Sequence, residues 1–299
     1  GLEKVLGSRK TLEALLIEEI EADIKAFGDK RRTVIEESDK AVLETPVLDE
    51  PVTVIFSNNG WVRSRQGNGV DPASLSFKEG DGLAALLPCR TVDPVIFLDS
   101  GGRAYSVEAG GLPSARGDGA PASSLVEVQG GAKIMHCVAG KPELKVLVAS
   151  SGGYGFLCSI GDMVSNRRAG REFMSVEAGE TPLAPFIYDE AAGNHVIALS
   201  AEGRLLAFDV AEMRAMSRGR GVIVMGLDKG EKLLAAAVTR LTSVTVSGIG
   251  RGGKERLLEI KGEKLRHHVG HRARMGRVLP EKIKPTGLAV PPKLQLDGK

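Results

Sequence analysis

Arginine and glycine recur together in short segments that are spaced regularly along the chain. Five such segments carry glycine, and the last four also carry arginine: 78–82, 115–119, 167–171, 217–221 and 273–277. Glycine allows a tight backbone whose amides can face an anion, and the guanidinium of arginine donates paired hydrogen bonds that match phosphate oxygens. The pattern therefore indicates a repeated phosphate-binding loop. Because the first segment is acidic, with Glu79 and Asp81, we interpret it as a solvated turn.

Two sets of arginines follow from this pattern as candidate phosphate ligands. The first set lies in or beside the loops: Arg116, Arg167, Arg168, Arg171, Arg218, Arg220, Arg272, Arg274 and Arg277. The second set lies on strands and turns nearby: Arg63, Arg103, Arg204, Arg251 and Arg256. Because each contact neutralises a phosphate and releases counterions, we expect binding with little sequence preference and a steep dependence on salt.

The charge of the chain is distributed unevenly, although its net value over 299 residues is only +2. Residues 1–50 and residues 51–213 each have a net charge of −5. Residues 214–299 combine 19 Lys and Arg with 7 Asp and Glu, for a net charge of +12. A basic C-terminal third favours a polyanionic partner, which the total charge conceals.

The elements that must position these loops are short β-strands arranged in repeats. Apolar runs rich in β-branched residues end in small glycine turns, and most are followed by a second short strand, as in a hairpin. The turn glycines lie at intervals of 42, 51, 50 and 50 residues: Gly60, Gly102, Gly153, Gly203 and Gly253. Five repeats predict an all-β fold built as a closed radial array, because one such unit cannot bury both of its faces. A β-sandwich with five similarly spaced hairpins is the alternative.

One amphipathic α-helix precedes the repeats. Its apolar residues from Leu12 to Phe27 lie on one helical face, with Ser8 as the N-cap and Gly28 at the end. Such a face must be buried, and we expect its partner outside this chain or in another protomer. We predict four parts, namely a helix within 1–35, an acidic linker over 36–50, the β-domain over 51–287 and a tail over 288–299.

Other residue types form no recognisable catalytic, metal or cofactor site. The cysteines Cys89, Cys137 and Cys158 lack CxxC spacing, and we interpret them as small core hydrophobes. His267, His268 and His271 have no cysteine or carboxylate at ligand spacing and have arginines beside them. We therefore expect no metal and assign these histidines to the phosphate-contacting surface. Residues 248–253 lack the lysine of a nucleotide-binding loop, so we expect neither ATP nor another cofactor.

Hydrophobicity along the chain predicts a soluble, cytoplasmic protein without membrane contact. The composition is 42% apolar and 26% charged, and no run approaches the roughly 18–20 apolar residues that span a bilayer.

The aromatic residues of the hairpins are interpreted as core residues, which disfavours recognition of single-stranded nucleic acid by base stacking: Trp61, Tyr105, Phe156 and Phe208.

Several longer stretches resemble a known family, the C-terminal domain of the A subunit of bacterial DNA topoisomerase IV, which is related to that of the DNA gyrase A subunit. The resemblance spans nearly the whole chain, and the stretches that carry it are 7–33, 51–54, 60–64, 112–117 and 153–156. The resemblance implies a five-bladed β-pinwheel, a propeller-like ring in which neighbouring blades exchange strands. It also implies a non-catalytic domain that binds and bends double-stranded DNA and helps select segments for ATP-dependent strand passage in decatenation and relaxation.

The resemblance also implies partners and a location, and the sequence departs from the gyrase pattern at one point. The partners are the rest of the A subunit and the ATPase-bearing B subunit of the holoenzyme, and the location is cytoplasmic, at the bacterial nucleoid. The nucleophilic tyrosine and its partner arginine belong to the core of the family, so no residue of this chain is assigned as catalytic. Gyrase carries an arginine-rich box in its first blade that supports DNA wrapping. Because 78–82 lacks arginine, the resemblance favours topoisomerase IV over gyrase.

Two further hypotheses compete with DNA binding. The acidic part over 51–213 is compatible with a protein-interaction module that docks a chromosome-maintenance partner, such as a condensin or a replication factor. A propeller enzyme would need clustered acid and base residues in a central channel, and the sequence holds no such motif. Within the DNA-binding interpretation, we expect blades four and five and the arginine loop of blade three to dominate contact, with little from blade one.

Overall fold

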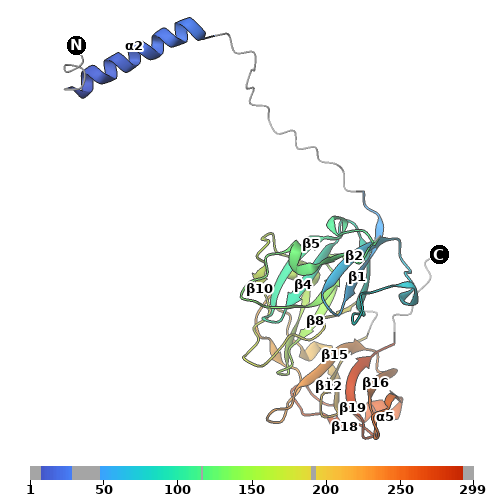
Figure 1. Cartoon of the computed structure of the whole chain (residues 1–299). Coiled ribbons are helices and arrows are strands. Elements are labelled where there is room, and N and C mark those ends of the chain that lie inside the picture. The colour runs from blue at the N-terminus through green and yellow to red at the C-terminus, as the bar shows by residue number, and fades with distance from the viewer. Residues whose placement is uncertain (1–7, 29–47, 116, 190–192, 292–299) are drawn as a thin grey trace. The chain divides into compact units, whose positions relative to one another are not determined.

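The computed structural model describes residues 8–28, 48–115, 117–189 and 193–291, which fall in two units, 1–45 and 46–299 (Figure 1). The described part of the first unit is one α-helix, α2 (Arg9–Phe27), which ends at Gly28, where the backbone amide donates to Ile24 O at 2.9 Å. Ser8 occupies the N-cap position, but its side chain makes no capping hydrogen bond, contrary to expectation. The helix buries none of its side chains. No described helix is long and apolar enough to cross a membrane.

The described part of the second unit forms five small antiparallel sheets, which we number as blades 1 to 5 in chain order. Blade 1 has the strand order β3-β1-β2-β6, with β1 (Pro51–Ser57), β2 (Trp61–Gln66), β3 (Leu83–Arg90) and β6 (Ala120–Pro121). Blade 2 has the order β10-β5-β4-β7, with β4 (Pro94–Asp99), β5 (Arg103–Glu108), β7 (Ile134–Ala139) and β10 (Arg171–Glu172). Blade 3 has the order β11-β8-β9-β14, with β8 (Lys145–Ala149), β9 (Tyr154–Ser159), β11 (Phe186–Tyr188) and β14 (Val222–Ile223).

The last two blades follow the same plan up to the final strand. Blade 4 has the order β15-β12-β13-β18, with β12 (His195–Ser200), β13 (Arg204–Asp209), β15 (Leu233–Thr239) and β18 (Arg277–Val278). Blade 5 has three strands among the described residues, in the order β17-β16-β19, with β16 (Ser243–Ile249), β17 (Glu255–Lys261) and β19 (Lys284–Ala289). Short helical turns join them: η1 (Pro72–Ser74), η2 (Ala109–Gly111), α3 (Ala122–Leu125), α4 (Ile160–Met163), η4 (Val210–Glu212) and α5 (Glu263–Arg266).

The fourth strand of each of the first four blades comes from the next repeat along the chain. Strand β6 follows β5 in sequence but pairs with β2 of blade 1, with Val62 opposite Ala120. Strands β10, β14 and β18 pair in the same way with β5, β9 and β13. This exchange confirms the prediction of an all-β, five-bladed β-pinwheel preceded by one helix.

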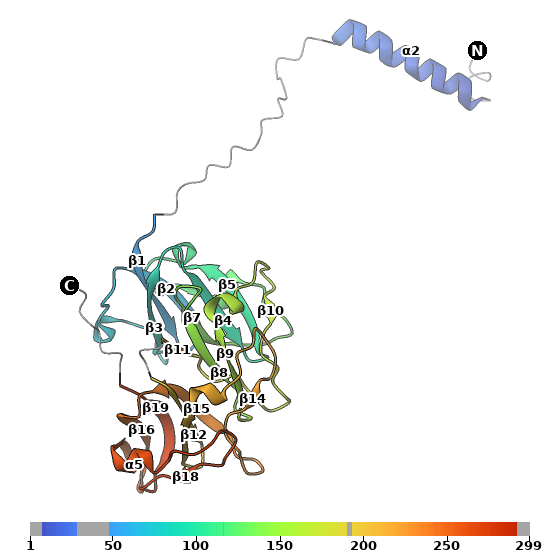
Figure 2. The same ribbon diagram turned by 180° about the vertical axis from the view of Figure 1, so that it is seen from behind.

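The sheets converge at one edge and expose the exchanged strand at the other. Strands β3 and β7 lie against each other, as do β11 and β15, and β15 and β19 (Figure 2). Strands β3 and β7 and the segment 184–187 line an apolar cavity of about 290 Å³ at this hub. Because the exchanged strands end the strand order at the opposite edge, they form the outer rim of their blades.

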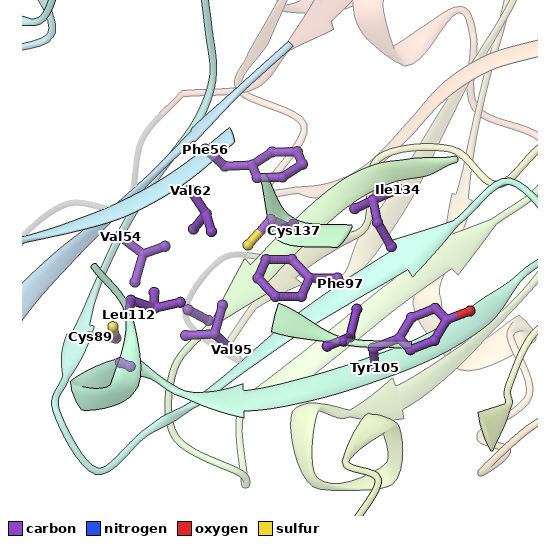
Figure 3. Packing of buried hydrophobic residues seen from close by; sticks show 14 of the residues in the cluster. Val54, Phe56, Val62, Cys89, Val95, Phe97, Tyr105, Leu112, Ile134 and Cys137 are labelled. Atoms are coloured by element: carbon purple, nitrogen blue, oxygen red, sulfur yellow. The ribbon is translucent and has the colours of Figure 1, made fainter. Parts of the chain in front are cut away.

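Neighbouring blades share buried cores. In the first core, Phe56 of blade 1 packs against Phe97 of blade 2 with ring centroids 6.2 Å apart (Figure 3). Similar clusters join blades 2 and 3, blades 3 and 4, and blades 4 and 5. The three cysteines are free and buried, as predicted. Burial raises the pKa of Cys89 to about 11 and that of Cys158 to about 12, so these thiols stay protonated.

The ring is not closed by strand exchange between blade 5 and blade 1 in the part of the chain that the structure describes. No described segment adds a fourth strand to β17, and no buried cluster of described residues joins these two blades. In the first repeat, the segment over 67–82 instead folds over its own blade. Thr53 Oγ1 donates to Gly67 O at 2.7 Å and Arg63 Nη2 donates to Ser76 O at 2.6 Å. Among the described residues, the predicted five-bladed array therefore has no exchanged strand between blades 5 and 1.

Candidate nucleic-acid interface

Four of the predicted arginine loops lead directly into the exchanged strands. The segments 115–119, 167–171, 217–221 and 273–277 end at or run into β6, β10, β14 and β18. Each loop therefore lies on the rim of the blade before its own repeat. The loops of repeats three, four and five lie on blades 2, 3 and 4. This shifts the predicted interface by one blade toward the N-terminus.

The segment 78–82 does not belong to this set, and it is a turn, as interpreted from the sequence. It is the turn before β3, and Gly82 O accepts from Asn58 N at 2.9 Å. The turns before β7 and β15 make the matching bond, from Ser100 N to Lys133 O and from Ala201 N to Lys232 O. The two kinds of loop look alike in sequence because both are short, charged and rich in glycine.

The glycines of the arginine loops serve docking of the loop on the preceding blade. Gly221 has a φ of +83°, and a Cβ there would lie 2.1 Å from Gly155 O. Gly276 has a φ of +74°, and its Cβ would lie 2.7 Å from Leu205 O. Gly119 and Gly170 have the same positive φ and similarly close carbonyl oxygens. Only glycine fits such a position without strain, so it is fixed by packing rather than by anion binding.

One open groove brings arginines from three segments together. It has a volume of about 470 Å³ and is lined by Arg103 of β5, by Arg167 and Arg171 of the third repeat, and by Arg218 of the fourth. Glu172 is the one acidic residue among its lining residues. Four guanidinium groups beside a single carboxylate create a positive potential that favours an anion with several oxygens, such as the phosphates of a nucleic acid.

The arginines of this groove differ in how firmly they are held. Arg103 Nε donates to Ala169 O at 2.7 Å, and Arg171 Nη2 donates to Ser217 O at 3.4 Å. The side chains of Arg167 and Arg218 are exposed and form no hydrogen bond or ion pair with any described residue. Arg168, next to Arg167, is equally exposed. Free guanidinium groups retain all their donors for phosphate.

The rim of blade 4 holds three more candidates. Arg274 is exposed, and its side chain has no partner among the described residues. Arg272 Nη1 donates to Ile223 O at 2.7 Å, whereas Arg277 Nη1 donates to His267 O at 2.6 Å. These two guanidinium groups bind the exchanged segment to its surroundings and keep part of their donors for a ligand.

Two predicted phosphate ligands are instead engaged with carboxylates. Arg220 forms ion pairs with Glu177 and with Glu180, the latter at 3.1 Å. Arg204 pairs with Asp228 at 2.9 Å and lies 3.8 Å from Glu231. The charge of both arginines is locally compensated.

Arg63 has a structural role that the sequence did not reveal. Its side chain is buried, and its guanidinium donates to Gly117 O at 2.8 Å and to Ser76 O at 2.6 Å. It joins the loop of the second repeat to the segment 67–82, which folds over blade 1, and it is not available to phosphate. Arg251 is exposed, and Arg256 lies 3.9 Å from Glu281. Arg116 lies outside the described residues.

The histidines of the fifth repeat are only partly at the surface. His268 is buried, contrary to the prediction, and burial lowers its pKa. His267 and His271 are exposed, and His271 lies 3.6 Å from Glu212. No group of three potential metal ligands occurs among the described residues. Of the four hairpin aromatics, Tyr105, Phe156 and Phe208 are fully buried. Trp61 is half-buried, and Lys78 Nζ lies 3.5 Å from the centroid of its ring.

One exposed arginine of the rim was missed in the sequence. Arg214 begins the segment that runs along β9, where its carbonyl accepts from Leu157 N at 2.9 Å. Its side chain has no partner among the described residues. The sequence signal was available, because Arg214 precedes the loop 217–221 in the basic C-terminal third.

The fold and the rim define a class, a β-propeller with exchanged strands and a basic outer edge. The family model that matches is the DNA gyrase C-terminal domain, beta-propeller, over residues 144–181 and 194–240. The DNA topoisomerase 4 A subunit of Neisseria gonorrhoeae is 40% identical over 92% of this chain, and that of Pseudomonas aeruginosa is 36% identical over 93%. The chain spans 36% and 38% of the lengths of these relatives.

Solved structures agree with these relatives. The Escherichia coli ParC C-terminal domain has a TM-score of 0.69 and 29% identity, covering 80% of this chain and 98% of that one. A DNA topoisomerase IV C-terminal domain has the same fold with a TM-score of 0.66 and 18% identity. The chain therefore belongs to the family of topoisomerase IV A subunits, in the region of the C-terminal propeller, which confirms the resemblance seen in the sequence.

Proposed function

We propose that the propeller is a non-catalytic domain that binds and bends double-stranded DNA in the A subunit of a topoisomerase IV. The observation that carries the proposal is the position of the arginine loops. Three described loops lie on the rims of consecutive blades, and each presents an exposed, unpaired arginine, as in Arg167, Arg218 and Arg274. An arc of guanidinium groups on consecutive rims suits the backbone of a duplex and reads no base sequence.

The same arc supports bending. A duplex is stiff over lengths of about 500 Å, and bending a site of 20–30 base pairs by 40–90° costs on the order of 1–6 kcal/mol. Contacts spread over three blades can offset that cost, because a straight duplex would reach fewer of them. In the full enzyme, the other domains of the A subunit would carry strand cleavage and the B subunit would carry ATP hydrolysis. This domain would help select and present the segment for transport in decatenation and relaxation.

The test is duplex binding by the whole chain as a function of salt. We expect the logarithm of the association constant to fall linearly with the logarithm of salt concentration, with a steep negative slope. The double variant Arg218→Glu with Arg274→Glu should lose most of the affinity and part of the slope. Salt-insensitive binding, absent binding, or an unchanged affinity of the double variant would contradict the proposal.

A further inference from the structure

Arg218 and Arg220 are two residues apart in one loop, yet their surroundings differ completely. Arg218 is exposed and lines the groove between blades 2 and 3. Arg220 forms ion pairs through its two terminal nitrogens with Glu177 and Glu180, and its guanidinium lies 3.9 Å from the ring centroid of Tyr154. Glu177 and Glu180 belong to the turn that precedes β11, so Arg220 connects two different segments of the chain.

This arrangement does not suit Arg220 as a phosphate ligand. Both terminal nitrogens already face carboxylates, one face of the guanidinium is covered by Tyr154, and Nε is buried. The cluster of one arginine and two glutamates has a net negative charge, which repels phosphate. The fork of the guanidinium is used to hold the protein together.

The rest of the loop is fixed by its backbone. The amide of Gly219 donates to Phe173 O at 2.8 Å, and Gly219 O accepts from Ser175 N at 3.0 Å. Gly221 docks against β9, as described above. Arg220 connects the same loop to the turn that carries Glu177 and Glu180. The loop that carries Arg218 is thereby fixed on both flanks.

We propose that Arg220, Glu177, Glu180 and Tyr154 form a clamp that positions Arg218 in the groove, and that Arg220 itself touches no DNA. We call these four residues the Arg220 clamp. This inference rests on the proposed function for its effect on DNA binding, but the clamp is a property of the fold. According to the proposal, Glu177 and Glu180 increase the affinity for DNA, although their negative charge alone would lower it.

The double variant Glu177→Gln with Glu180→Gln tests the clamp, because the clamp predicts a loss of duplex affinity where removal of negative charge alone predicts a gain. Glu172→Gln is the matched control, because Glu172 lines the same groove, is exposed and has a side chain without a partner among the described residues. Removal of its charge should raise duplex affinity about twofold, since a repulsive group is lost. The double variant should instead lower duplex affinity about fivefold, because the loop loses its anchor. Affinity of the double variant equal to or above that of Glu172→Gln would overturn the proposal.

A second pair of variants separates positioning from direct contact. Arg220→Lys keeps the charge but cannot bind both carboxylates as a fork, so it should lower affinity as much as the double variant. Arg218→Lys should bind nearly as the wild type, because lysine still neutralises phosphate as a point charge. Equal, near-wild-type affinity of both lysine variants would assign Arg220 to direct contact and overturn the proposal.

Amide hydrogen exchange at Gly219 provides a readout that needs no DNA. The clamp predicts faster exchange in the double variant and in Arg220→Lys than in Glu172→Gln, since the hydrogen bond from Gly219 to Phe173 opens more often. Unchanged exchange would overturn the clamp even if DNA binds. Failure of the wild type to bind duplex DNA would contradict the proposed function and leave this exchange experiment as the test of the clamp.

Discussion

The rims of blade 1 and of blades 2 to 4 have the same architecture and different chemistry. Each receives an exchanged strand that is preceded by a glycine with positive φ packed against the blade. On blades 2, 3 and 4 the loops expose Arg167, Arg218 and Arg274. On blade 1 the described part of the loop exposes Asp118, and the nearby Arg63 is buried in hydrogen bonds to carbonyl oxygens.

Under the proposed function, this difference makes strand exchange and DNA binding separable properties. Exchange needs the glycine and the edge of the preceding blade, whereas phosphate binding needs an unpaired guanidinium at the surface. We expected blades four and five and the loop of blade three to dominate DNA contact, and the structure places these loops one blade earlier. The loops of repeats three to five lie on blades 2 to 4, and of the predicted arginines Arg251 and Arg256 belong to the hairpin of blade 5.

Charge reversal should give the largest contrast between the two kinds of rim. The variant Arg167→Glu with Arg218→Glu places two repulsive groups in the groove and should lower duplex affinity about 100-fold at moderate salt. Arg65→Glu is the single reversal on blade 1, where Arg65 is exposed on β2, and should lower affinity less than about threefold, against about tenfold per reversed charge in the groove. Fluorescence anisotropy with a labelled duplex measures both. Equal losses would remove the distinction between the rims.

Substitution of the docking glycines should affect stability on each of blades 1 to 4 but DNA binding only where arginines are exposed. Gly221→Ala on blade 3 and Gly119→Ala on blade 1 each combine a positive φ with a carbonyl oxygen within 2.3 Å of the new Cβ. We expect each to lower the free energy of unfolding by about 2–4 kcal/mol. Gly230→Ala has a similar φ of +84° with open space around it and should cost about 1 kcal/mol.

These glycine variants are compared by chemical denaturation and by duplex binding below their melting temperatures. Gly221→Ala should also weaken duplex binding, because it displaces Arg218. Gly119→Ala should leave duplex binding nearly unchanged. A greater loss of affinity in Gly119→Ala than in Gly221→Ala would place the interface on blade 1.

Arg63→Gln should separate stability from binding on blade 1. The buried guanidinium donates to Gly117 O and Ser76 O, so its loss leaves carbonyl oxygens without their donors and should cost about 1–3 kcal/mol. Duplex affinity should stay within about twofold of the wild type, because the side chain is buried away from phosphate. A marked loss of affinity without a loss of stability would return Arg63 to the interface.

Acid should destabilise the rim of blade 4 slightly. Burial lowers the pKa of His268 below its ordinary value of 6.5, so the folded state favours the neutral ring and the unfolded chain takes up the proton first. The stabilisation is present above pH 6.5 and is lost as the pH falls below that value. His268→Gln should reduce the fall in stability between pH 7 and pH 5 by about 1 kcal/mol. Blade 1 carries no histidine and offers no such group.

The sequence was sufficient for the repeats, the fold and the basic arc, and insufficient for individual side chains. The spacing of turn glycines from Gly60 to Gly253 predicted five blades because each blade repeats one hairpin. Local composition could not separate 78–82 from the arginine loops, since strand exchange is a long-range pairing. Nor could it show that Arg63 is buried or that Arg220 is paired with Glu177 and Glu180, because those partners are distant in sequence.

The salt dependence of duplex binding by a neutralised rim tests the central claim most directly. The variant Arg167→Gln, Arg168→Gln, Arg218→Gln and Arg274→Gln removes four exposed, unpaired charges from blades 2 to 4. If each contacts a phosphate, the slope of the logarithm of the association constant against the logarithm of salt concentration should become less negative by about 3 to 4. An unchanged slope in a folded variant would show that these arginines do not contact DNA.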